Sequence, residues 1–237
     1  MYALNTLWLT AALLSLASDA WAGPGGIIKA AASTPFGRVV LGILFILLSP
    51  FIISYLIKRA LQIRKTRKDL ALLATIHPQY KWLDVKDRTT ATLQWVWSAW
   101  GEQKMEKSAA FTTEWYRINQ QMFLDDWARI GQENVCRLHR IKNISPLFVQ
   151  HNAENNGEGS RIVLDINLRV TDYLKDIESG KVVEGDKKIA DMETIWTLVW
   201  NKGEWRLNLI ESAGMEWSYL TMPNELPAEL SPTPQRI

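Results

Sequence analysis

Cysteine, histidine and net charge are all scarce in this sequence of 237 residues. Its one cysteine, Cys136, excludes a disulfide within the chain and fits a reducing compartment. A formal net charge of +2 gives no overall indication of nucleic-acid binding, and we expect no nucleic-acid partner. The sequence also lacks a phosphate-binding loop, a dinucleotide-binding fingerprint and a Ser/His/Asp set. We therefore assign no catalytic residue and expect no cofactor.

The scattered histidines argue against a metal site. His77, His139 and His151 lie far apart, and Cys136 precedes His139 by three residues. A Cys-x-x-His pair is a weak signal without two further ligands at suitable spacing. In a strand, positions 136 and 139 face opposite ways. We therefore expect no bound metal.

Charge is wholly absent from Val39 to Ile57, and this stretch predicts a transmembrane helix. Nineteen helical residues reach about 28 Å, close to the ~30 Å hydrocarbon core of a bilayer. Pro50 falls within the span, where we expect a kink but no end of the helix. The alternative is a buried helix of a soluble protein, which would need a core on all sides.

An earlier apolar segment, residues 1–22, predicts a secretory signal peptide. Small residues flank Trp21 in the sequence Ala20-Trp21-Ala22, as a signal peptidase requires. The segment before it contains no Lys or Arg, unlike most signal peptides. The alternative is an uncleaved first membrane helix.

Basic residues follow the predicted span and predict its orientation. Only Lys29 and Arg38 lie between Ala22 and the span. The positive-inside rule then places the C-terminal side in the cytoplasm, for either interpretation of residues 1–22. We expect residues 58–80 to form a basic juxtamembrane helix that contacts anionic headgroups, with a simple stop-transfer flank as the alternative. The residues expected at the lipid surface are Lys58, Arg59, Arg64, Lys65, Arg67 and Lys68.

Residues 81–221 predict one folded domain with helices first and strands after. Apolar residues at helical spacing predict a helix from Trp82 to Trp100, ended or bent by Gly101. A second helix is predicted from about Glu106 to Ile130. Its inward stripe would comprise Phe111, Trp115, Ile118, Met122, Phe123, Trp127 and Ile130.

The second half of this domain predicts an antiparallel sheet. Alternating apolar residues predict strands at about 135–150, 161–174, 192–200 and 204–212, the last two joined by a hairpin loop at 201–203. Helices followed by a meander indicate an α+β fold, with the helices packed on one curved sheet. Four prolines after residue 222 predict a disordered tail at 222–237.

Tryptophan is abundant, and ten of its twelve copies follow residue 80. One interpretation is a filled aromatic core. The other is an open pocket that accepts an acyl chain or an apolar peptide side chain, lined by Trp196, Trp200 and Trp205.

Two carboxylates are candidates for a place inside such a pocket. Asp172 continues the apolar face of its strand, and Glu193 begins the next predicted strand. Burial would raise the pKa of either one, as acid–base chemistry often requires. The alternatives are that Asp172 caps a turn and that Glu193 pairs with a neighbouring Lys or Arg.

The order of four segments resembles the Tim-forty-four-like domain family, which includes the matrix-side anchor of the mitochondrial import motor and bacterial membrane-tethered relatives. The resemblance covers about Trp82 to Glu211, and its segments are SAWGEQKMEK, ARIGQENVCRL, DYLKDIESGKVVEG and ETIWTLVWNKGEWRLNLI. It implies a nuclear-transport-factor-two-like cone with an apolar hollow. It also implies a binding and tethering role at a bacterial inner membrane, with an unidentified protein partner and anionic lipid. The alternative function is a small lyase or isomerase with a lipophilic substrate. A further alternative, a periplasmic cone domain, conflicts with the charge asymmetry around the span.

Overall fold

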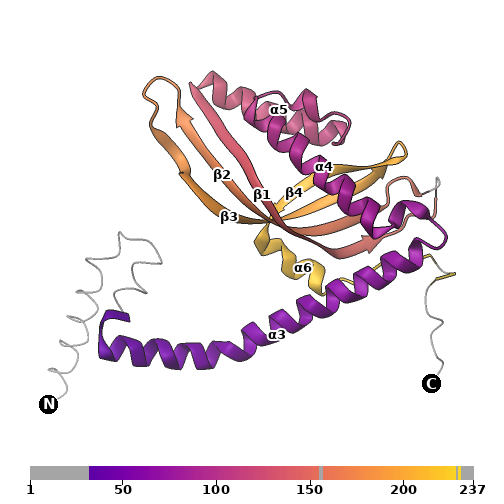
Figure 1. Cartoon of the computed structure of the whole chain (residues 1–237), viewed down its shortest axis with the longest axis horizontal. Helices are drawn as coiled ribbons and strands as arrows, with labels where there is room; N and C mark the ends of the chain where they lie inside the picture. The colour runs from indigo at the N-terminus through magenta and orange to yellow at the C-terminus, as the bar shows by residue number, and fades with distance from the viewer. Residues whose placement is uncertain (1–31, 155–156, 228, 231–237) are drawn as a thin grey trace, which may run out of the picture. The chain divides into compact units, whose positions relative to one another are not determined.

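The computed structural model describes residues 32–154, 157–227 and 229–230 (Figure 1). The predicted signal peptide at 1–22 lies outside this range. The described chain divides into two compact units between Ile57 and Lys58.

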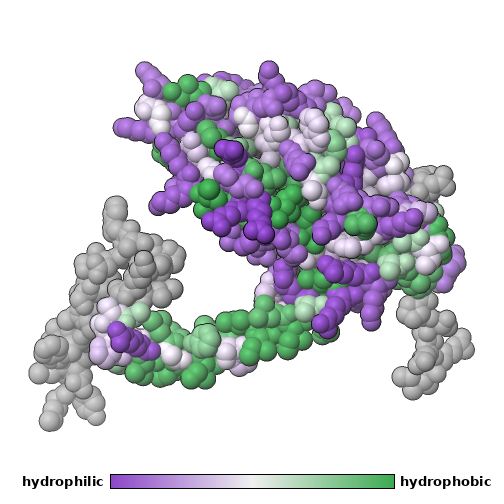
Figure 2. Space-filling model, viewed as in Figure 1, coloured by the Kyte–Doolittle hydropathy of each residue, from purple (hydrophilic) through white to green (hydrophobic). Residues whose placement is uncertain are grey.

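The first unit contains the apolar part of a long helix, α3 (Pro35–Leu73). This helix includes the predicted span, and Pro50 lies inside it without ending it, as predicted. It is long and apolar enough to cross a membrane, and none of its most apolar 18-residue window is buried. Hydrophobic side chains cover this part of the helix in Figure 2. A core helix of a soluble protein would instead be enclosed, so that alternative does not fit.

The second unit, from Lys58 onward, is an α+β domain built on one sheet, as predicted. Its sheet has the strand order β1-β2-β3-β4, and every neighbouring pair is antiparallel. Helices α4 and α5 lie over one face of this sheet in Figure 1. After α3, its elements are η2 (Pro78–Tyr80), α4 (Trp82–Gly101), η3 (Met105–Ser108), α5 (Glu114–Arg129), β1 (Gln132–Gln150), β2 (Arg161–Asp176), β3 (Val182–Asn201), β4 (Glu204–Ser212), η5 (Ala213–Met215) and α6 (Glu216–Leu220).

Helix α4 matches the helix predicted from the apolar spacing at 82–100. Its buried residues include Val85, Leu93 and Val96, which are spaced by eight and three and therefore share one face. Strand β2 also lies where it was predicted, but residues 162–166 are buried on both faces of the sheet, so burial does not alternate there as the sequence does.

The predicted start of the next helix at Glu106 is wrong. The chain first forms η3, and α5 then begins at Glu114, where the Thr113 hydroxyl accepts a hydrogen bond from the Tyr116 amide at 3.2 Å. Between them, Phe111 and Thr113 exchange backbone hydrogen bonds of 2.8 Å with Leu207 of β4. This short extended segment covers the edge of β4, and a continuous helix could not supply that pairing.

The predicted inward stripe of α5 is also wrong. Its inner face carries Tyr116, Leu124 and the half-buried Trp127. Most of the predicted stripe points to solvent instead, namely Trp115, Ile118, Met122, Phe123 and Ile130. Because α5 has apolar residues on both faces, helical periodicity alone could not choose the face that meets the sheet.

Strand β3 begins ten residues before its predicted start at 192. Residues 182–191 are exposed or half-exposed and pair with β2 only, because β4 reaches no further than Thr194. Their polar sequence, rich in Lys and Asp, gave no strand pattern.

The predicted disorder from residue 222 is wrong for residues 222–227. The Glu225 amide donates to the Val149 carbonyl at 2.9 Å, and the His151 amide donates to the Glu225 carbonyl at 2.9 Å. Leu226 packs against the hydrophobic core. The segment therefore adds an ordered edge contact to β1.

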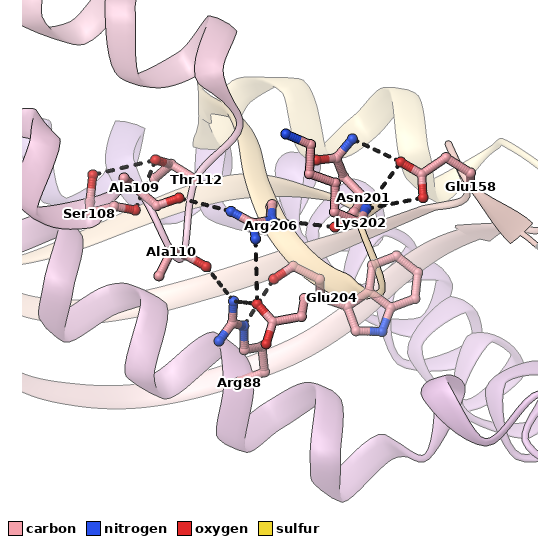
Figure 3. Close-up of polar contacts among 11 residues, drawn as sticks. Arg88, Ser108, Ala109, Ala110, Thr112, Glu158, Asn201, Lys202, Glu204 and Arg206 are labelled. Atoms are coloured by element: carbon pink, nitrogen blue, oxygen red, sulfur yellow. Dashed lines mark hydrogen bonds and ion pairs between the residues drawn. The ribbon is translucent and has the colours of Figure 1, made fainter.

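A polar network around Arg88 holds the loop before α5 against the β3–β4 hairpin (Figure 3). The Arg88 guanidinium donates to the Trp205 carbonyl at 3.0 Å, to the Ala110 carbonyl and to the Glu204 carboxylate at 2.7 Å. It also lies 4.4 Å from the centre of the Phe111 ring. One side chain of α4 thereby joins two segments that are distant in sequence.

We predict that Arg88→Ala lowers the free energy of unfolding by about 2–3 kcal/mol, because it removes the donor to two carbonyl groups and one of the two cations beside the Glu204 carboxylate. Thermal unfolding of the detergent-solubilised chain measures this loss. Lys86→Ala, at an exposed position on the same helix, is the matched control and should change stability little. Equal stability of the two variants would contradict the role given to Arg88.

Candidate functional site

A cavity of about 310 Å³ lies between the two helices α4 and α5 and the sheet. Every one of the elements α4, α5 and β1 to β4 contributes to its wall. The lining residues are Val96, Trp97 and Trp100 of α4, Tyr116, Gln120 and Trp127 of α5, and Asn134, Cys136, Asp172, Met192, Thr194, Trp196 and Ile210 of the sheet. The cavity is therefore largely aromatic and apolar, with a few polar groups, as small-molecule sites usually are.

Asp172 is the carboxylate of this cavity. It lies within β2, two residues beyond the buried Val170 on the same face, so the prediction that it continues the apolar face is confirmed. Its Oδ1 accepts a hydrogen bond of 3.0 Å from Nδ2 of Asn134 on β1. Burial raises the pKa of Asp172, against the hydrogen bond from Asn134, and the charge of Glu184 adds to the rise.

A bulge between β2 and β3 shapes the backbone at Asp172. Between the pairs Val170–Ala190 and Asp172–Asp186, one residue of β2 faces three of β3. Gly185 has a φ of +79°, and a Cβ atom there would lie 2.6 Å from the Asp172 carbonyl oxygen. Glycine is therefore required beside Asp172 for this close approach.

The three tryptophans predicted to line a pocket separate into two places. Trp196 lines the cavity, and its Nε1 donates to the Thr194 hydroxyl at 3.1 Å. Trp200 and Trp205 do not line it. Their rings pack 5.2 Å apart, and Trp205 also lies 5.4 Å from Tyr80. These two belong to the filled aromatic core that was the alternative interpretation.

The other titratable groups of the cavity are neutral near pH 7. Burial raises the pKa of the Cys136 thiol to about 12, and the charge of Asp172 adds to this rise. Burial also raises the pKa of the Tyr116 phenol. In the described part of the chain, no group of three or more His, Cys, Asp or Glu side chains is placed to hold a metal ion. His77 and His151 stack with ring centres 4.4 Å apart, away from Cys136 and His139.

Five of the six residues predicted at the lipid surface are exposed on α3. The exposed residues are Lys58, Arg64, Lys65, Arg67 and Lys68. The same helix segment is also docked, because Gln62 and Thr66 are buried and both donate to the Leu147 carbonyl. Headgroup contact by the exposed set stays a prediction.

Arg59 differs from the other five because its guanidinium lies among three carboxylates. It pairs with Asp165 of β2, with Glu216 of α6 at 2.6 Å and with Glu193 of β3 at 3.4 Å. The Asp165 side chain is fully buried, and its Oδ1 has no hydrogen-bond partner among the described residues. The charge of Arg59 is therefore directed at the domain itself.

This cluster lies on the sheet face opposite to the cavity. Asp165 and Asp172 are seven residues apart on β2, an odd number that puts them on opposite faces. Glu193 shares the Arg59 face, whereas its neighbours Met192 and Thr194 line the cavity. The prediction of Glu193 as an inward carboxylate of the pocket is therefore wrong, and its alternative, pairing with a basic residue, is confirmed.

Asn134 is a polar residue of the cavity that sequence reasoning did not single out. Its signal was present as the asparagine of the Gly-x-x-Asn step that follows α5, quoted above only as part of a resemblance. Nothing in the sequence shows that this asparagine meets Asp172, because the pairing of β1 with β2 brings them together.

We predict that Asp165 makes the stability of the domain depend on pH. Burial raises the pKa of Asp165 to about 7, against the attraction of Arg59, and Glu193 and Glu216 add to the rise. Because this pKa exceeds the ordinary value of 3.8, the folded state holds a proton that the unfolded state has lost between about pH 4 and pH 7. The free energy of unfolding should therefore fall as pH rises through this window.

Thermal unfolding of the detergent-solubilised chain at pH 5 and pH 8 measures the effect. Asp165→Asn should flatten the dependence, whereas Glu178→Gln, at an exposed position, should leave it as in the wild type. Arg59→Gln should lower the free energy of unfolding most at pH 8, because the carboxylates are ionised there and the variant lacks their counter-charge. An unchanged pH dependence in Asp165→Asn would contradict this account.

No family model and no curated protein matches the chain. Among solved structures, it is similar to the intermembrane-space region of the chloroplast protein ARC6, with 14% identity, a TM-score of 0.39 and coverage of 54% of this chain and 95% of that one. It is also similar to a protein from Xanthomonas campestris described as a candidate polyketide cyclase. That match has 13% identity, a TM-score of 0.29 and coverage of 57% of this chain and 98% of the other.

Proposed function

We propose that the chain is a membrane-tethered binding module that recruits a protein partner or lipid at the cytoplasmic face of a bacterial inner membrane. The observation that carries this proposal is that one chain combines an apolar helical segment, unburied over its most apolar 18 residues, with a folded domain that contains an aromatic cavity. The helix serves as the tether, and the cavity serves as the ligand site. The cavity supports the finer fold proposal of a nuclear-transport-factor-two-like cone of the Tim-forty-four-like type.

The exposed basic residues of α3 support the proposed orientation. They follow the apolar segment directly and are exposed to solvent, whereas Gln62 and Thr66 of the same segment are buried against the domain. Cytoplasmic loops carry an excess of such residues. Near an anionic surface each charge contributes about 1 kcal/mol of attraction.

A second candidate function, a lyase or isomerase, is favoured by Asp172 alone. A carboxylate with a raised pKa inside an aromatic cavity is an arrangement that general acid–base enzymes use. Incubation of the protein with any cavity ligand, followed by mass spectrometry of that ligand, separates the two functions. A binding module returns the ligand unchanged, and turnover that Asp172→Asn abolishes would establish the enzyme.

We predict that Cys136 is protected from an impermeant thiol reagent in intact spheroplasts and is labelled after lysis in mild denaturant. The proposed orientation places the domain in the cytoplasm, and the denaturant is needed because the thiol is partly buried. A cysteine introduced at the exposed Glu178 is the control, since it should be labelled after lysis without denaturant. Labelling of either cysteine in intact spheroplasts would reverse the orientation.

We also predict salt-dependent binding of residues 58–237 to anionic vesicles. Binding should be lost by about 0.5 M salt, where the Debye length falls well below its physiological ~8 Å. Changing Arg64, Lys65, Arg67 and Lys68 together to Gln should weaken binding similarly in low salt. The matched control changes the exposed basic residues Lys181, Lys187 and Lys188 of β3 and its preceding turn to Gln. Binding that ignores salt, or equal losses in both variants, would contradict headgroup contact by α3.

A further inference from the structure

The charged side chains that line the cavity are of one sign, negative. Asp172 is its only acidic residue, and none of the described residues that line it is Lys, Arg or His. Cys136 and Tyr116 keep their protons near pH 7, because burial raises the pKa of both groups. An ionised Asp172 therefore has no counter-charge from the wall of the cavity.

One buried acceptor atom at this point lacks a donor within the described residues, and the carboxylate beside it has a single one. Within the described ranges, Asp172 forms no ion pair, and its one side-chain hydrogen bond comes from Asn134. Oδ1 of Asn134 is buried and has no hydrogen-bond partner in the same part of the chain. A buried amide oxygen without a donor costs free energy, and so does a half-buried carboxylate without a counter-charge, and native proteins usually satisfy such groups.

Aromatic rings surround the same space. The cavity is lined by five aromatic side chains, Trp97, Trp100, Trp127, Trp196 and Tyr116. The ring centres of Trp100 and Trp127 lie 5.9 Å apart. The face of an aromatic ring carries partial negative charge and attracts a cation, most strongly for tryptophan. The acceptor atoms and the aromatic rings thus both favour a cationic ligand.

We propose that the cavity binds a small organic cation, a protonated amine attached to a short apolar body. The ammonium group pairs with the Asp172 carboxylate, and the apolar body lies among the tryptophan rings. The cavity volume of about 310 Å³ sets the size at a small molecule. A fatty acid would place its carboxylate beside Asp172, and a phosphate-bearing headgroup would find no basic side chain in the lining.

This inference rests on the proposed function, because it treats the cavity as the ligand site of a binding module. It goes further by fixing the charge of the ligand. The two proposals would be contradicted by different results. If the cavity prefers a neutral apolar molecule, the cation proposal is wrong but the protein can still be a binding module. If the topology is reversed, the proposed orientation is wrong but the cation site is unaffected.

The test compares three probes of equal length, butylammonium, butanol and butyrate, by calorimetric titration. The full chain is reconstituted in nanodiscs of neutral lipid, and empty nanodiscs are titrated in parallel. We expect butylammonium to bind at least tenfold more tightly than butanol and butyrate not to bind. Butanol binding as tightly as the amine, or tighter binding of butyrate, would overturn the proposal.

Three variants locate the binding. Asp172→Asn should weaken butylammonium binding at least tenfold, and Trp127→Leu should weaken the amine more than butanol, because it keeps an apolar side chain and removes the ring. Asp126→Asn, an exposed carboxylate of α5, is the matched control and should bind as the wild type does. If Asp172→Asn does not fold, the preference among the three probes and the binding of butylammonium by Trp127→Leu still test the proposal. Binding unaffected by both cavity variants would place the amine elsewhere and overturn the proposal.

Discussion

The alternation of side chains along β2 is the constraint on which the arrangement of this domain depends. Successive residues of a strand point to opposite faces, so Asp165 and Asp172 cannot share an environment. Helices α4 and α5 enclose Asp172 with aromatic rings, while α3 and α6 bring Arg59 and Glu216 to Asp165. One central strand thus supports a cavity on one face and a charged contact on the other.

The two faces handle a buried carboxylate in different ways. Asp165 has a cation within the fold, although three carboxylates share that one guanidinium. Within the described part of the chain, Asp172 has only an amide donor, which leaves its charge uncompensated. Burial of an unpaired charge is costly, and the cost is relieved by a proton or by a ligand cation. This difference makes the cavity, and not the Arg59 cluster, the stronger candidate for a binding site.

The basic segment of α3 has two chemical roles on two sides. Its exposed residues remain available for the proposed contact with anionic lipid. Arg59, Gln62 and Thr66 instead make polar contacts with the domain. A positive-inside count treats every Lys and Arg as equivalent, so it could not separate Arg59 from its neighbours.

The sequence by itself determined the features that depend on local patterns. Absence of charge located the apolar helix, helical spacing located α4, and alternation located β2 with Asp172 on its apolar face. The tertiary structure decided which face of α5 turns inward, because both of its faces are apolar. It also decided the partners of Asn134 and Arg59, which lie 38 and 106 residues from the carboxylates that they contact. Such pairs depend on strand register and helix docking, which are set by the packing of the whole core. The periodicity of a local sequence segment therefore does not predict them.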